Sequence, residues 1–229
     1  MARNPSRAFT LIELLVVIAV IAILATIAYP VYTGVQERAK ITKDMNNLRQ
    51  IGLATQTYMN DNDGVLPGST TATWMSQLEL NQKYLSAWRV LLSPFDARST
   101  SELGDATTRI SYGINVKVYP NNAAISADRI TKPTAFILFA PAQDSATTVN
   151  FQGTATNPGP PFGVTLFGDS GTVTSNPGGV PTGGTQNNRS RINALFADLH
   201  CETMAWAAFT STTANPGEPD QWTPYIPYP

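Results

Sequence analysis

The first quarter of the chain changes from an unbroken apolar pattern to an amphipathic one. Residues 14–28 are 15 positions at which only Thr26 is polar. Extended to residues 11–29, the apolar segment has 19 residues, which as an α-helix would be about 29 Å long. Since the hydrocarbon core of a bilayer is about 30 Å thick, this pattern predicts a helix that can cross a membrane.

Three kinds of apolar N-terminal segment compete as explanations. The segment is longer than the core of a usual secretory signal, and it ends at residues 28–30 in a poor site for signal peptidase. A buried core helix fits less well, because residues 14–28 show no polar face. An uncleaved anchor fits the length, and Arg3 and Arg7 before it predict a cytoplasmic N-terminus with the rest of the chain outside.

After Pro30 the apolar residues recur at spacings of three and four, which predicts a helix with one buried face. This stripe consists of Ile41, Met45, Leu48, Ile51, Ala54 and Tyr58. Most polar residues fall off the stripe, namely Arg38, Lys40, Lys43, Asp44, Asn47 and Arg49. The polar run at 60–64 ends the pattern. A single helix over residues 9–59 would be about 76 Å long, and its second half needs a sheet to pack on.

The rest of the chain predicts one short helix and several strands. Residues 74–88 carry Trp74, Leu78 and Leu85 on one side of a helix. Segments rich in β-branched and aromatic residues predict strands at 110–119, 135–140, 163–168, 171–175, 191–198 and 200–206, the last two around a tight turn. Residues 152–188 are typical of long loops, and the tail after Thr210 is rich in proline. This order predicts an α+β fold, in which an antiparallel sheet covers the second half of the long helix.

Composition excludes several classes of protein. The formal net charge is −1 over 229 residues, so the chain offers no broad electrostatic footprint for nucleic acid. One Cys cannot close an intrachain disulfide, and one Cys with one His supplies too few ligands for a structural zinc site. A hydrophobic content of 42% is too high for a wholly disordered chain.

Two pairs of polar residues could carry chemistry. Asp198 and His200 lie two apart, but no nucleophile motif accompanies them, so hydrogen bonding within a hairpin explains them better than catalysis. Asp61 and Asp63 offer the hard oxygen ligands that calcium prefers. Their surroundings do not match an EF-hand loop, and a turn that ends the helix is the simpler explanation. We therefore predict no catalytic residue and no cofactor, with calcium at Asp61 and Asp63 as the alternative.

Glu13 is an acid near the start of the apolar segment. A carboxylate at the centre of a bilayer costs about 2.5–3.5 kcal/mol on insertion scales, and less near the end of the helix. Two explanations remain open on this evidence alone. The side chain either reaches the lipid headgroups, or it has a partner of opposite charge.

Residues 7–15, RAFTLIELL, closely resemble the prepilin processing and methylation signal of type IV pilins and of type II secretion pseudopilins. The resemblance implies that a prepilin peptidase cuts between Ala8 and Phe9 and methylates the new amine of Phe9. The family strongly prefers Gly where this chain has Ala8. The resemblance also gives Glu13 a partner, the Phe9 amine of a neighbouring subunit, and opposite charges attract strongly in a low-dielectric bundle. Pro30 matches a family position at which the helix bends or melts locally.

The body of the chain also looks like a large group of pseudopilin-like bacterial proteins. The similar segments are 46–53, 61–64, 111–115 and 196–200. Two positions depart from that group. It usually has Gly at the position of Leu199, where the turn favours a left-handed backbone. It often has Cys at the position of Ser93, so any disulfide to Cys201 is absent here.

The resemblance implies three parts: a cleaved leader at 1–8, a transmembrane and filament-core helix at 9–30, and a pilin-like globular domain at 31–229 that includes the amphipathic half of the helix. It implies a non-enzymatic structural subunit of a pilus-like filament, with a type II secretion pseudopilin as the first expectation. A type IV pilin that serves adhesion, motility or DNA uptake is the alternative. A membrane-anchored binding module is a third reading, which leaves Glu13 and Pro30 unexplained.

The expected partners follow from the same resemblance. They are further copies of the chain in a helical filament, the prepilin peptidase and methyltransferase, the inner-membrane assembly machinery and, before assembly, the lipid bilayer. The expected location is the bacterial inner membrane, as a single-pass protein with a cytoplasmic N-terminus, and afterwards a periplasmic or cell-surface filament.

Overall fold

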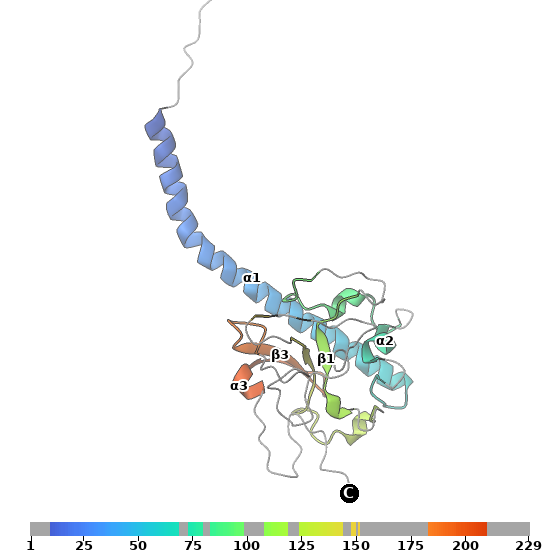
Figure 1. Cartoon of the computed structure of the whole chain (residues 1–229). Coiled ribbons are helices and arrows are strands. Elements are labelled where there is room, and N and C mark those ends of the chain that lie inside the picture. The colour runs from blue at the N-terminus through green and yellow to red at the C-terminus, as the bar shows by residue number, and fades with distance from the viewer. Residues whose placement is uncertain are drawn as a thin grey trace, which may run out of the picture. The chain divides into compact units, whose positions relative to one another are not determined.

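The computed structural model describes residues 10–68, 73–79, 83–98, 108–118, 124–143, 148–149, 151 and 183–209 (Figure 1). Several expectations lie outside these residues: the leader at 1–8 with Phe9, the strands at 163–168 and 171–175, and the proline-rich tail. The chain divides into two compact units, Met1–Ala39 and Lys40–Pro229.

One long helix, α1 (Leu11–Asp61), has 51 residues and contributes to both units, which confirms the long N-terminal helix predicted from the sequence. Its second half follows the amphipathic stripe, with Leu48, Ile51 and Ala54 buried. The helix continues through Pro30 without a break. Thr33 Oγ1 donates a hydrogen bond to the Pro30 carbonyl oxygen at 3.0 Å just after it.

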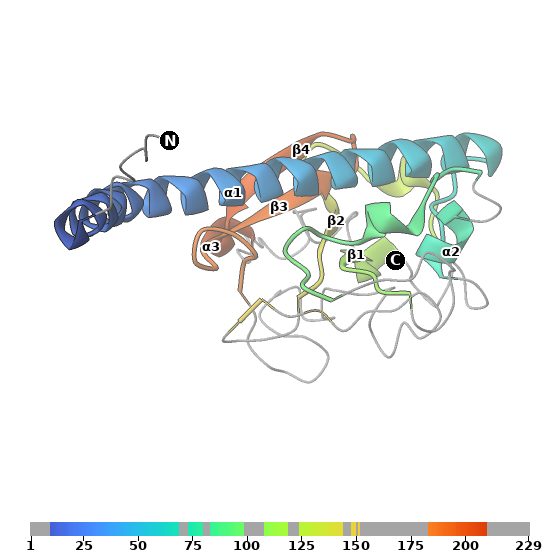
Figure 2. The ribbon, with the colours of Figure 1, turned by 90° about the horizontal axis from the view of Figure 1, so that it is seen from above.

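The second unit contains a four-stranded antiparallel sheet in the order β1-β2-β3-β4, which confirms the expected α+β layout. Its strands are β1 (Tyr112–Ile114), β2 (Ile137–Pro141), β3 (Arg191–Phe196) and β4 (Cys201–Ala205). The hairpin of β3 and β4 matches the two strands predicted around a tight turn. Figure 2 shows the C-terminal half of α1 lying along the sheet.

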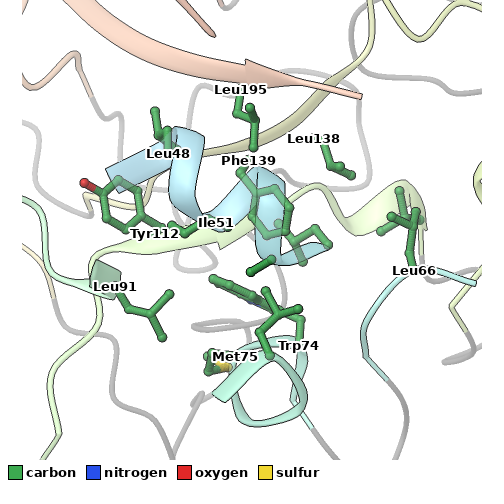
Figure 3. Packing of buried hydrophobic residues seen from close by; sticks show 14 of the residues in the cluster. Leu48, Ile51, Leu66, Trp74, Met75, Leu91, Tyr112, Leu138, Phe139 and Leu195 are labelled. Atoms are coloured by element: carbon green, nitrogen blue, oxygen red, sulfur yellow. The ribbon is translucent and has the colours of Figure 1, made fainter. Parts of the chain in front are cut away.

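Each face of the sheet carries a cluster of buried side chains. Side chains along β3 alternate between the two faces, so β3 contributes to both clusters. Leu195 belongs to a cluster on the α1 face that includes Leu48, Ile51 and Phe139 (Figure 3). Trp74 of α2 (Trp74–Glu79) packs edge-on against Phe139, with ring centroids 4.9 Å apart. A second cluster contains Ile137, Ala140, Ile192, Ala194, Phe196 and, from α3 (Trp206–Phe209), Phe209.

Two predicted elements are shorter than expected. The helix predicted over 74–88 ends at Glu79 in α2, and a separate 3-10 turn, η2 (Trp88–Leu91), follows. The strand predicted over 110–119 ends at Ile114 and continues as a 3-10 turn, η3 (Val116–Val118). The physical reason is Asn115, whose side chain accepts the Lys117 N–H at 3.0 Å and so forms a turn in place of further strand pairing.

Gly52 lets α1 approach the sheet closely. A Cβ atom at this position would lie 3.2 Å from both δ-carbons of Leu195 and 3.4 Å from Cδ2 of Leu199.

We expect Gly52→Val to lower the free energy of unfolding of the second unit by about 1–3 kcal/mol, because overpacking forces side chains off their rotamers. Urea denaturation of the full chain in detergent, followed by Trp fluorescence, measures this. Gln56→Val, on the exposed face of α1, is the control. Equal losses in both variants would contradict the close packing at Gly52.

Candidate functional site

The first half of α1 presents an apolar surface that the described residues leave uncovered. Every large hydrophobic side chain between Leu11 and Val35 is exposed, from 49% at Val17 to 80% at Leu11. By length and composition α1 is able to cross a membrane. An apolar surface of this extent in a folded chain marks a site of contact with lipid or with other protein chains.

Glu13 lies in the first turn of α1 and forms a reciprocal cap with Thr10. The Thr10 N–H and Oγ1 donate to Glu13 Oε2 at 2.9 and 2.8 Å, and the Glu13 N–H donates to Thr10 Oγ1 at 3.3 Å. This is a capping box, in which the residue before the helix and the third residue within it satisfy each other's free N–H groups. The Thr-x-x-Glu spacing of Thr10 and Glu13 is the sequence signal by which this capping box could have been predicted.

The capping box uses only one of the two carboxylate oxygens. Within the described part of the chain, Glu13 Oε1 accepts no hydrogen bond, and the side chain is exposed. Thr10 directly follows Phe9 in the sequence, so the cap lies one residue from the predicted cleavage point. Ala8 and Phe9 themselves are outside the described residues. The geometry therefore offers a carboxylate that is held in place and still open to a cation.

Asp61, one of the two calcium candidates, already has partners. Its Oδ2 lies 2.8 Å from Lys83 Nζ and accepts a hydrogen bond from Tyr84 Oη at 3.2 Å. The Lys83 ammonium lies 4.8 Å from the centroid of the Tyr84 ring. Asp63 follows the end of α1 with a left-handed backbone, φ 52°, as in a turn that ends a helix. Across the described ranges there is no group of three or more His, Cys, Asp or Glu that could hold a metal, and calcium at this pair stays a prediction.

Asp198 and His200 make hydrogen bonds within the β3–β4 turn. Asp198 Oδ1 accepts the His200 N–H at 3.2 Å and lies 2.5 Å from His200 Nδ1. The His200 ring stacks on Phe196 with centroids 4.2 Å apart. Leu199 has φ 71°, the left-handed backbone conformation that Gly adopts most readily. Burial raises the pKa of the neighbouring Cys201 thiol to about 11, with weaker effects of Arg49 and Asp44, so this thiol is not an activated nucleophile.

A buried acid, Asp44, ties α1 to three other segments. The residue is fully buried. Its Oδ1 accepts hydrogen bonds from Ser93 Oγ at 2.6 Å and from Tyr112 Oη at 2.7 Å, and its Oδ2 accepts one from Asn193 Nδ2 at 2.8 Å. Ser93 lies in the loop after η2, Tyr112 in β1 and Asn193 in β3. One carboxyl group therefore fixes α1 against the sheet and a neighbouring loop.

Further hydrogen bonds extend this group. Asn47 Nδ2 donates to Tyr112 Oη at 3.2 Å, and Thr203 Oγ1 of β4 donates to Asn193 Oδ1 at 2.7 Å. We refer to these six residues as the Asp44 clamp: Asp44, Asn47, Ser93, Tyr112, Asn193 and Thr203. The prediction that Asp44 and Asn47 lie off the buried stripe is wrong, because both residues are buried. Partners between 45 and 149 residues away, which periodicity cannot detect, hold them there.

Residues 3–29 match the family model described as the prokaryotic N-terminal methylation motif. The match covers the predicted cleavage point, Glu13 and the whole apolar segment at 11–29. It supports a prepilin-type N-terminus broadly and does not separate pilins from pseudopilins. Neither curated proteins nor solved structures gave a match to the chain.

The hydrogen bond from Lys83 lowers the pKa of Asp61, and the Tyr84 hydroxyl and the charge of Lys83 act in the same direction. Because the native pKa lies below the ordinary value of 3.8, the ion pair stabilises the fold at neutral pH, and this contribution is lost as the pH falls through the native pKa. We expect Lys83→Ala to raise the pKa of Asp61 toward that ordinary value. An NMR titration of the Asp61 carboxyl carbon measures it, with the exposed Lys132→Ala as control. An unmoved titration in Lys83→Ala would contradict the pairing.

Proposed function

We propose that this chain is a structural, non-enzymatic subunit of a pilus-like filament, most specifically a pseudopilin of a type II secretion system. The observation that carries the proposal is the coincidence of two features in one segment. Residues 3–29 match the methylation motif, and the first half of the helix that they begin exposes its apolar side chains all round. A surface of this kind needs lipid before assembly and other copies of the same helix after it.

The proposed sequence of events starts in the inner membrane. The precursor spans the bilayer once, with residues 1–8 in the cytoplasm and the globular domain on the other side. Prepilin peptidase cuts between Ala8 and Phe9 and methylates the new amine. The apolar halves of α1 then bundle into a filament core, and the globular domains coat its outside. The contact between one copy and the next is head-to-tail, so the assembly is open-ended.

The proposed role of Glu13 is to set the axial position of each new subunit. Thr10 holds the carboxylate through Oε2 and leaves Oε1 for the Phe9 amine of a neighbour. An unpaired charge is costly inside an apolar bundle, whereas a paired and hydrogen-bonded one is tolerated. Positions in which the amine and the carboxylate fail to meet are therefore disfavoured.

A type IV pilin that serves adhesion, motility or DNA uptake is the runner-up. The body of the sequence resembles pseudopilin-like proteins at 46–53 and 111–115, which favours the secretion role. Deletion of the gene separates the two candidates. A pseudopilin leaves secreted proteins trapped in the periplasm when it is lost, whereas a pilin leaves surface filaments missing and secretion intact.

The charge of Glu13, beyond its capping role, is expected to drive assembly. Glu13→Gln keeps a side-chain oxygen for the Thr10 donors but loses the charge, and we expect filament yield to fall about tenfold or more, since about 1.4 kcal/mol already changes an equilibrium tenfold. Thr10→Ala is the matched control, because it removes the hydroxyl cap and keeps the charge. Quantitative immunoblotting of sheared filaments against membrane precursor measures the yield. Normal assembly of Glu13→Gln would refute the charge pairing, and equal loss in Thr10→Ala would assign the effect to capping.

Processing at Ala8 is expected to be measurable on the intact protein. Mass analysis of the chain from purified filaments should find an N-terminus at Phe9 that carries one methyl group on its amine. Because the family prefers Gly before the cut, Ala8→Gly should raise the processed fraction in a pulse-chase experiment. A filament subunit that retains Met1 and carries no methyl group would rule out the prepilin-type pathway.

A further inference from the structure

Asp44 is an acid buried without a counter-charge. All three of its hydrogen-bond partners, Ser93, Tyr112 and Asn193, are neutral donors, and no Lys, Arg or His within the described ranges pairs with it. A buried carboxylate that lacks a cation carries a large desolvation cost, which three neutral hydrogen bonds offset only in part. The charged form of the clamp is therefore the less favourable one.

The clamp accommodates a neutral carboxyl group without moving its heavy atoms. Both partners of Asp44 Oδ1 are hydroxyl groups, and a hydroxyl can act as donor or acceptor by rotating its proton. A protonated Asp44 can donate from Oδ1 to Ser93 Oγ or to Tyr112 Oη, while Oδ2 keeps the hydrogen bond from Asn193. The heavy atoms thus suit either protonation state, with the hydroxyl that accepts the Asp44 proton turning its own proton away from Oδ1, and only the neutral state avoids burying a charge.

The titratable groups that face Asp44 do not change charge between mildly acidic and neutral pH. Burial raises the pKa of Tyr112 well above its ordinary value, and the nearby Asp44 charge adds to this effect. Burial raises the pKa of Cys201 on β4 to about 11, and Arg49 of α1 interacts with this thiol. Burial also raises the pKa of Asp44 itself, against the opposing effect of its three donors. Lys40 and Lys43 lie on the exposed side of α1.

We propose that Asp44 is a proton-linked lock that holds the C-terminal half of α1 tightly against the sheet when its carboxyl group is protonated and less tightly when it is ionised. A group whose native pKa is raised contributes stability that is fully present below its unfolded value and is lost as the pH rises through the native value. Protonation of Asp44 therefore stabilises the fold as the pH falls, whereas protonation of carboxylates in ordinary acid denaturation destabilises it. It concerns the second unit alone and does not depend on the proposed filament role, so either can fail without the other.

The test compares the pH dependence of unfolding in the full chain held in detergent micelles. All 4 Trp residues lie after residue 39, at 74, 88, 206 and 222, so Trp fluorescence in urea reports on the second unit. Asp44→Asn mimics the neutral carboxyl group, and its NH₂ can donate to the two hydroxyl oxygens. Asp128→Asn makes the same chemical change at an exposed position and is the matched control.

We expect the unfolding equilibrium constant of the wild type to rise with pH from about pH 4 until the pH passes the raised native pKa of Asp44. The total rise should be about tenfold for each unit by which the native pKa exceeds the unfolded one. This rise should vanish in Asp44→Asn and persist in Asp128→Asn. Asp44→Asn should also be at least as stable as wild type at neutral pH. If Asp44→Asn instead keeps the wild-type slope, or is less stable than wild type at neutral pH only, the lock is refuted.

A second variant and a direct measurement keep the proposal testable if Asp44→Asn fails to fold. Tyr112→Phe removes one donor and keeps the ring, so it should destabilise the fold more at neutral pH, where the carboxylate needs that donor, than at acidic pH. The infrared band of a protonated carboxyl group should persist in the wild type at pH values where exposed aspartates are ionised. Its absence, or a pH-independent loss in Tyr112→Phe, would overturn the proposal.

Discussion

The uncovered apolar surface at the start of α1 is the constraint on which the rest of this protein depends. Between Leu11 and Val35 every large hydrophobic side chain is exposed, and the described residues supply nothing to cover them. Water is a poor solvent for such a surface, so burial of these side chains in lipid or against other chains is strongly favourable. The charge of Glu13 lies at the start of this segment, and a separate unit folds around the other half of the helix.

Glu13 and Asp44 lie on the same helix, and each must offset the desolvation free energy of a carboxylate near apolar side chains. They do so in opposite ways. Glu13 is exposed, shares one oxygen with Thr10 and leaves the other open, which suits a contact made only on assembly. Asp44 is sealed within the second unit, and both of its oxygens are occupied. Its hydrogen bonds therefore act within the fold, where they fix the position of α1 against the sheet.

Residue type and periodicity were sufficient to predict α1 and the β3–β4 hairpin. An unbroken apolar run followed by an amphipathic stripe indicates the long helix, and β-branched and aromatic residues around a tight turn indicate the two strands. These signals failed where a single side chain decides. Asn115 ends β1 early by a local hydrogen bond. Asp44 is buried although its residue type and position suggest an exposed one, because Ser93, Tyr112 and Asn193, which lie 49, 68 and 149 residues away, enclose it. The cap of Thr10 on Glu13 is predictable from the Thr-x-x-Glu spacing of the two residues.

Ser93 has a mechanical consequence. The hydroxyl group of Ser93 joins the loop after η2 to α1 by a hydrogen bond to Asp44, and not by a covalent cross-link. A force applied to α1 would act on the hydrogen bonds of Asp44, which can break and then re-form when the force is removed. The attachment of α1 to this loop can therefore open and close without an oxidant, a reductant or any change in covalent bonding.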